Sequence, residues 1–182
     1  MDLNKNYSFF SVCVALGPLF PSISSSVSRL LANLRALVRP KKIPLAYIMV
    51  LGAETYGKML AVKQVDNANP RQFHDTIAKS DKVDKITKGR ILRSHHAATN
   101  GYETLSLFTG AVITSNIAGV PVSTINLLSL AYLGSRALYN FIYIHLQENR
   151  KYGPVRSVVW MASVGFWFTL YIQAGLRAMR TS

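Results

Sequence analysis

Charged residues are scarce in this sequence, and cysteine is nearly absent. Charged residues make up 16% of the 182 positions, against about 25% in a typical soluble domain, whereas 49% are hydrophobic. This shortage of charge favours a protein in contact with lipid. The single cysteine, Cys13, excludes a disulfide scaffold and a cysteine metal site by count. Cys13 lies before the predicted helices, so thiol chemistry would need a thiol carried by a small molecule.

Acidic residues are also absent between Asp2 and Glu54, where serine and arginine are frequent. That composition resembles a transit peptide, and an interfacial amphipathic helix fits nearly as well. Pro18 and Pro21 interrupt the apolar part, which makes it a poor membrane span. We therefore interpret residues 1–42 as an apolar and basic amphipathic arm, separate from a membrane domain over residues 43–182.

Two long segments lack charge altogether. No charged residue occurs from Thr104 to Ser135 or from Ser157 to Leu176. Because about 20 apolar residues span a bilayer as a helix, both segments favour membrane helices over buried helices of a soluble protein. The net charge of +13 comes from residues in the connections, and no nucleic-acid motif accompanies them. This pattern predicts contact with anionic lipid headgroups and no nucleic-acid partner.

Turn residues divide the membrane domain into helices and predict an all-α, integral membrane four-helix bundle. The predicted helices cover residues 43–63, 83–117, 121–146 and 154–177. The connections 64–87 and 147–153 then lie on one side of the membrane. Their Lys and Arg residues indicate the cytosolic side, although the five positive residues between 29 and 42 weaken that count.

Glu54 lies in the middle of the first predicted span. A carboxylate at that depth should face the bundle interior or find a partner. Lys58 follows four residues later, at the spacing of a helical ion pair, and can satisfy Glu54 alone. Both interpretations stay open.

The second and third predicted helices each carry a polar stripe. With about 100° between successive side chains, the first stripe falls within an arc of about 80° and excludes His95. The stripes consist of Arg93, His96, Asn100 and Glu103, and of Arg136, Tyr139 and Tyr143. Two such stripes predict a shared polar cavity for a charged, peptide-like ligand. The alternative is a structural lock in which Glu103 pairs with Arg136 or Arg93.

Other chemistries have weaker support. His95, His96 and Glu103 are close in sequence, but adjacent histidines point to different faces of a helix and no further spacing completes a zinc set. We therefore predict no metal site. The sequence also has no glycine-rich phosphate loop and no supported Ser-His-Asp arrangement.

The two stripes resemble the signatures of a known family. Arg93-x-x-x-Ala97-x-x-Asn100-x-x-Glu103, followed by Leu107-Phe108, is similar to the second-helix signature of the MAPEG family, the membrane-associated proteins in eicosanoid and glutathione metabolism. Arg136-x-x-Tyr139-x-x-x-Tyr143 resembles the third-helix signature, and GPVRSVVW (153–160) the start of the fourth helix in the prostaglandin E synthase branch. The DNANPR segment indicates a divergent branch of fungal or bacterial type.

This resemblance implies a homotrimer, most readily in the endoplasmic reticulum, with glutathione bound between protomers on the cytosolic side. The stripe residues would hold glutathione, and Arg156 would stabilise its thiolate, with Arg150 as the second choice. A cation near a thiol lowers the pKa of that thiol. The N-terminal arm leaves a mitochondrial membrane as an alternative.

His96 departs from the family pattern, because many glutathione-using members have arginine there. Histidine is shorter and only partly charged near neutral pH, so glutathione binding would weaken, or His96 would act as a proton shuttle. The expected function is a glutathione-dependent transferase, isomerase or peroxidase acting on a lipophilic electrophile. The alternatives are a glutathione-independent isomerase or cyclase of a hydrophobic metabolite, and a non-catalytic lipid-binding scaffold.

Overall fold

The chain is helical wherever its structure is described. The computed structural model describes residues 42–66 and 68–181, which contain no strand. The predicted all-α fold class is confirmed for these residues. The predicted N-terminal arm and Cys13 lie outside them, apart from Lys42 at the arm's last position.

Five α-helices occur in the described residues, where four were predicted. They are a helix over residues 42–60, α3 (Phe73–Lys79), α4 (Lys85–Ile117), α5 (Val122–Phe141) and α6 (Gly153–Thr181). Short turns of other helix types join them: η2 (Val62–Gln64), η3 (Pro70–Gln72), the π-helix η4 (Ile142–Leu146) and η5 (Arg150–Tyr152). The four long helices lie close to the predicted ranges, and α3 is the addition.

The extra helix, α3, lies in the connection that the sequence presents as polar. Its two buried residues, Phe73 and Ile77, are four positions apart and therefore lie on one face of the helix. They pack with Ala61 and Ile91 in one apolar cluster. Because a helix this short is marginal in water, its packing against the long helices accounts for its formation.

Local signals determine where the long helices begin and end. The Asp84 carboxylate accepts a hydrogen bond from the Thr87 backbone N–H (2.9 Å), so α4 begins at Lys85. Gly119 has a φ of 71° in the turn that follows α4, a conformation that glycine adopts readily, and Pro121 precedes α5. The first helix ends at residue 60 rather than 63, because the chain turns into η2.

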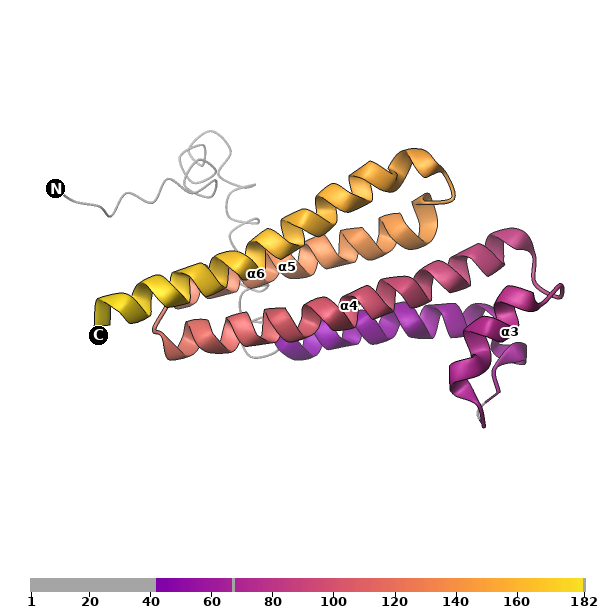
Figure 1. Ribbon diagram of the computed structural model, residues 1–182, viewed down its shortest axis with the longest axis horizontal. Coiled ribbons are helices and arrows are strands. Elements are labelled where there is room, and N and C mark those ends of the chain that lie inside the picture. Colours follow the sequence, from indigo (N-terminus) through magenta and orange to yellow (C-terminus); the bar gives the residue numbers. More distant parts are fainter. Residues whose placement is uncertain (1–41, 67, 182) are drawn as a thin grey trace, which may run out of the picture. The chain divides into compact units, whose positions relative to one another are not determined.

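The helix over residues 42–60 runs beside α4, and α5 runs beside α6 (Figure 1). Glycines permit the closest approaches of the first pair: Gly57 lies against Ser94, and Gly101 lies against Val50. Between α4 and α6, the Ser115 hydroxyl donates to the Leu170 carbonyl (3.1 Å). These contacts hold the polar residues of α4 at fixed positions against the other helices.

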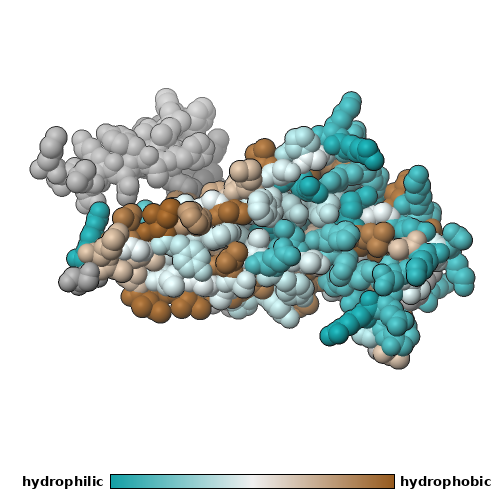
Figure 2. All heavy atoms as spheres, in the orientation of Figure 1, coloured by the Kyte–Doolittle hydropathy of each residue, from teal (hydrophilic) through white to brown (hydrophobic). Residues whose placement is uncertain are grey.

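The outer surface of the bundle is unusually apolar. Large apolar side chains of α6 such as Val158, Met161 and Phe168 are more than half exposed. Figure 2 shows hydrophilic residues gathered at the end that carries α3 and the turn between α5 and α6, with hydrophobic residues toward the other end. Exposed apolar area of this kind indicates a lipid or subunit contact.

Length and composition identify one helix that could cross a membrane, where four spans were predicted. Among the described helices it is the continuous segment Arg150–Arg180, which contains η5 and most of α6, and 11% of its most apolar part is buried. Polar residues lower the hydropathy of the other helices: Glu54 and Lys58 in the first, a polar first half in α4, and Arg136 in α5.

Candidate functional site

A cleft between α4, α5 and α6 brings together one predicted residue from each helix. Asn100, Tyr139 and Arg156 line it, and the wall is completed by Ser157, Trp160 and Met161. Its volume of about 360 Å³ lies within the range of small-molecule pockets, roughly 300–1,000 Å³. The buried side-chain oxygen of Asn100 has no hydrogen-bond partner among the described residues. We call this space the α4–α6 cleft.

Arg136 is not part of the α4–α6 cleft lining, but it contacts Tyr139, which is, and it is 4% exposed. Its guanidinium carbon is 4.4 Å from the centre of the Tyr139 ring, a cation–π contact. Neither terminal nitrogen has a hydrogen-bond partner in the part of the chain that the structure describes, and no carboxylate there pairs with Arg136. A buried charge without a counter-ion costs several kcal/mol, so an anion at this position would be strongly favoured.

Aromatic rings link Arg136 to Arg156. The Tyr139 and Tyr143 ring centres are 5.6 Å apart, and the Arg156 guanidinium carbon lies 4.7 Å from the centre of the Tyr143 ring. Arg156 also donates a hydrogen bond to the side-chain oxygen of Gln147 (3.0 Å). Two positive charges therefore flank a pair of phenols, and Tyr139 and Arg156 of this group line the α4–α6 cleft.

Arg93 has a different set of contacts from the rest of its stripe. Its Nε and one terminal nitrogen donate to the Ile144 carbonyl (3.2 and 3.1 Å), and that terminal nitrogen also lies 3.3 Å from a Glu148 carboxylate oxygen. Ile144 belongs to η4, the π-helix that ends the third long helix. Arg93 thus caps a carbonyl near a helix C-terminus, where a positive charge is favourable.

Three other predicted residues lie outside the α4–α6 cleft lining. His96 and Glu103 are exposed on α4, and Arg150 is exposed in η5. Within the described ranges Glu103 forms no ion pair, so the predicted lock with Arg93 or Arg136 is absent there. Of the first stripe, the structure therefore brings Asn100 together with four predicted residues from later in the chain, and it does not bring the whole stripe there. Those four are Arg136, Tyr139, Tyr143 and Arg156.

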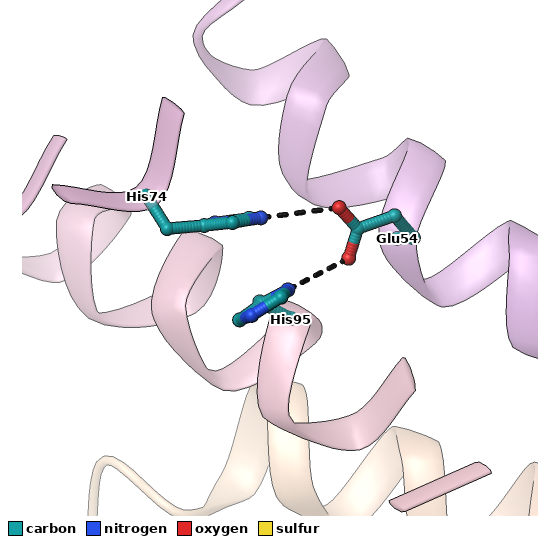
Figure 3. Close-up of side chains that lie close together, drawn as sticks. All are labelled: Glu54, His74 and His95. Carbon is teal, nitrogen blue, oxygen red and sulfur yellow. Dashed lines mark hydrogen bonds and ion pairs between the residues drawn. The ribbon is translucent and has the colours of Figure 1, made fainter. Parts of the chain in front are cut away.

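A second polar cluster consists of Glu54, His74 and His95, from three different helices (Figure 3). Glu54 Oε1 lies 3.1 Å from His74 Nε2, and Glu54 Oε2 lies 3.0 Å from His95 Nδ1. The Lys58 ammonium is 3.3 Å from Oε1. Glu54 therefore forms both predicted kinds of contact, the helical pair with Lys58 and contacts with residues of other helices.

The contact of Glu54 with His74 was missed because it depends on α3. His74 lies in the segment that was predicted to be a polar connection between two helices. Its burial lowers the pKa of the His74 ring, against the opposing effect of Glu54, and favours the neutral ring near pH 7. The available signals were an acidic residue inside an apolar helix and a histidine, His95, off the polar stripe.

Comparison with known proteins identifies a family but no individual relative. A sequence model of the MAPEG family matches residues 43–176, nearly the whole described region. No curated protein and no solved structure gives a match. Since the match covers more than half of the chain, the chain belongs to the MAPEG family, the membrane-associated proteins of eicosanoid and glutathione metabolism.

Proposed function

We propose that the chain is an integral membrane enzyme that uses glutathione as a co-substrate against a lipophilic electrophile. The reaction type is transfer, isomerisation or peroxide reduction. Glutathione would occupy the α4–α6 cleft and extend past Tyr139 to Arg136, and the electrophile would enter from the bilayer. Membership of a membrane family concerned with glutathione and eicosanoid metabolism supports this proposal.

The buried, unpartnered guanidinium of Arg136 is the observation that carries it. Glutathione is a net anion at neutral pH, with two carboxylates that can accept the hydrogen bonds that Arg136 leaves unmade. Hydrogen bonds between ionised partners are about twice as strong as neutral ones, and arginine suits planar carboxylates. Asn100 offers a further unpartnered polar atom for the peptide portion of glutathione.

Arg156 is our choice for the residue that stabilises the thiolate. It lines the α4–α6 cleft, whereas Arg150 is exposed and outside the lining. A guanidinium beside the sulfur favours loss of the thiol proton. In the transfer reaction, the sulfur lone pair then forms a bond to an electrophilic carbon of the substrate, and the electron pair of the broken bond leaves with the departing group or is protonated.

The assembly is part of the same proposal. We propose four membrane spans and a homotrimer in the endoplasmic reticulum membrane, with the α3 end on the cytosolic side. The exposed apolar side chains of α6 supply a surface for lipid or for a neighbouring subunit. Native mass spectrometry of the detergent-solubilised chain should therefore give the mass of a trimer.

Glutathione binding tests the function directly. Calorimetry should detect binding to the purified wild-type chain, and bound glutathione should give thiolate absorbance in the ultraviolet. Arg156→Ala should remove that absorbance while the protein remains folded, and Arg150→Ala is the matched control that should retain it. If wild-type protein does not bind glutathione, the proposal fails, and turnover of a lipophile without a thiol would replace it. If Arg150→Ala alone loses the absorbance, the role moves to Arg150.

A further inference from the structure

The Glu54–His74–His95 cluster joins three elements that are far apart in sequence. Glu54 belongs to the helix over residues 42–60, His74 to α3 and His95 to α4. The three side chains converge on one point (Figure 3). The two imidazole rings are stacked with their centres 3.6 Å apart and an angle of 24° between their planes. This cluster shares no residue with the α4–α6 cleft lining.

The donor atoms in the cluster have the spacing of a metal site. One atom from each residue can be chosen such that all lie within 4.8 Å of one another. In a tetrahedral zinc site with bonds of about 2.0–2.2 Å, neighbouring donor atoms are about 3.3 Å apart. The present nitrogen–oxygen distances of 3.1 and 3.0 Å are slightly shorter, as expected when a proton rather than a metal lies between the two atoms.

The donor types narrow the choice of cation. Imidazole nitrogens suit zinc and other late first-row metals, whereas magnesium and calcium prefer oxygen ligands. Two histidines and one glutamate form a recognised three-ligand zinc set, in which a water or another ligand takes the fourth position. The ligand side chains are 19%, 13% and 38% exposed for Glu54, His74 and His95, so that solvent can reach them.

Lys58 is the one feature of the cluster that opposes a cation. Its ammonium pairs with Glu54, but its side chain is 36% exposed and can turn into solvent. An exposed helical pair of this spacing contributes only about 0.3–0.5 kcal/mol, so a bound metal would displace it at little cost. Lys58 would then tune the affinity by repulsion without preventing binding.

We propose that Glu54, His74 and His95 bind one zinc ion per protomer, with the fourth coordination position open, and so fasten α3 to the two long helices. The apolar contacts of Phe73 and Ile77 hold α3 in place, and the metal adds a bond from α3 to each neighbour. This inference does not depend on glutathione.

Zinc binding by the full chain, purified without a histidine tag and stripped with a chelator, tests the proposal. We expect one zinc per protomer by elemental analysis, and visible absorption from cobalt substituted at the site. His74→Gln and His95→Gln should each lower zinc affinity by about 100-fold or more, because even loss of an outer-shell partner costs 10–100-fold. Zinc should raise the unfolding temperature of the wild type, and magnesium should not.

Two of the four histidines, His96 and His145, lie outside the cluster and provide matched controls. His96→Gln and His145→Gln should leave the zinc affinity unchanged, and Lys58→Gln should raise the zinc affinity. Wild-type protein with less than one zinc, or an equal loss in the His96 or His145 variant, overturns the proposal. If the His74 and His95 variants do not fold, absence of cobalt absorption from the wild type overturns it.

Discussion

Two polar clusters in this bundle differ in whether their buried charge is paired. At Glu54 one carboxylate has three partners, from its own helix, from α3 and from α4. At Arg136 the guanidinium lies over the face of the Tyr139 ring, and its terminal nitrogens lack hydrogen-bond partners in the described ranges. The Glu54 carboxylate is paired within one protomer, whereas the Arg136 guanidinium lacks a counter-ion in the described residues.

This difference separates a contribution to stability from a contribution to binding. A satisfied cluster stabilises the fold, and removing its central residue should lower stability. An unsatisfied buried charge destabilises the fold until a ligand pairs with it, and removing that charge should improve stability while abolishing binding. Opposite responses of stability to mutation at Glu54 and at Arg136, measured without zinc and without glutathione, would therefore distinguish the paired cluster from the unpaired one.

The largest expected effect is that of Arg136→Met on glutathione binding. Loss of one partner from a desolvated ionic contact costs about 2–5 kcal/mol, so calorimetry should show affinity at least about 30-fold weaker. Without glutathione, the unfolding temperature of this variant should equal or exceed that of the wild type, because the unpaired charge is gone.

Arg71→Met is the matched control for that change, because Arg71 is exposed in η3. It should alter neither binding nor stability. A variant at Arg136 that unfolds at a clearly lower temperature without ligand would show that the guanidinium has a structural partner, such as a neighbouring subunit, and would end the contrast between the two clusters.

The next effect is the loss of stability in Glu54→Ala. The change removes the acceptor of two histidine contacts and one ion pair, and hydrogen bonds to charged groups contribute about 1.5–3 kcal/mol. Allowing for partial exposure, we expect the free energy of unfolding to fall by about 2 kcal/mol, measured by denaturation in detergent with a chelator present. Glutathione affinity should stay within about twofold of the wild-type value, because the Glu54 cluster and the α4–α6 cleft share no residue and should therefore act independently.

Lys58→Ala is its control, since it removes only the helical pair and should cost about 0.5 kcal/mol or less. Equal losses in the Lys58 and Glu54 variants would show that the two histidines contribute nothing to stability. The contrast between the clusters would then reduce to one ordinary ion pair.

The long helices were predictable because their signals are local. Charge-free runs, Pro121 and the Gly153-Pro154 step place α4, α5 and α6 within a few residues of their observed bounds. Periodicity likewise placed Asn100 and Tyr139 on helix faces that line the same cleft. What periodicity gives is the direction of a side chain from its own helix axis.

Periodicity cannot give the rotation of one helix against its neighbour, and there the predictions fail. Arg93 shares a face with Asn100 but lies about two turns away, where the end of the third long helix presents the Ile144 carbonyl. For the same reason the Glu54–His74–His95 cluster was not predicted. His74 reaches Glu54 because Phe73 and Ile77 dock a seven-residue helix, α3, which the polar composition of its segment conceals.

A smaller effect is expected from Gly57→Ala, which forces the first helix away from α4. The added methyl group would meet the Ser94 hydroxyl, which donates to the Ile91 carbonyl (2.7 Å). Overpacking costs about 1–3 kcal/mol, and we expect about 1 kcal/mol because a serine hydroxyl can rotate. Denaturation should show this loss, and zinc affinity should fall with it, because Glu54 and His95 lie on the two separated helices.

Ser94→Gly in the Gly57→Ala background should restore much of the zinc affinity, because it reopens the space between the helices. If the single variant binds zinc as well as the wild type, the spacing of these helices does not control the cluster. Glutathione affinity is the internal reference for both variants and should not change.

The smallest expected effect lies outside both clusters, at the Asp84 cap of α4. The hydrogen bond from the Thr87 backbone N–H holds the pKa of Asp84 below its ordinary value, so its contribution to stability is fully present above a pH of about 4 and is lost as the pH falls through the lowered pKa. Asp84→Ala should lower the unfolding temperature slightly at neutral pH, and Asp84→Asn, which can also cap, should lower it less. Below that pH the unfolding temperature of the wild type should approach that of the Asn variant.

Asp84 begins the helix that contributes both His95 and Asn100, so Asp84→Ala sharpens the comparison between the two clusters. A cap defect should weaken zinc and glutathione binding equally, whereas the Glu54 and Arg136 variants should each affect one of the two ligands. Unequal losses of zinc and glutathione affinity in Asp84→Ala would mean that α4 does not transmit the defect as one rigid element.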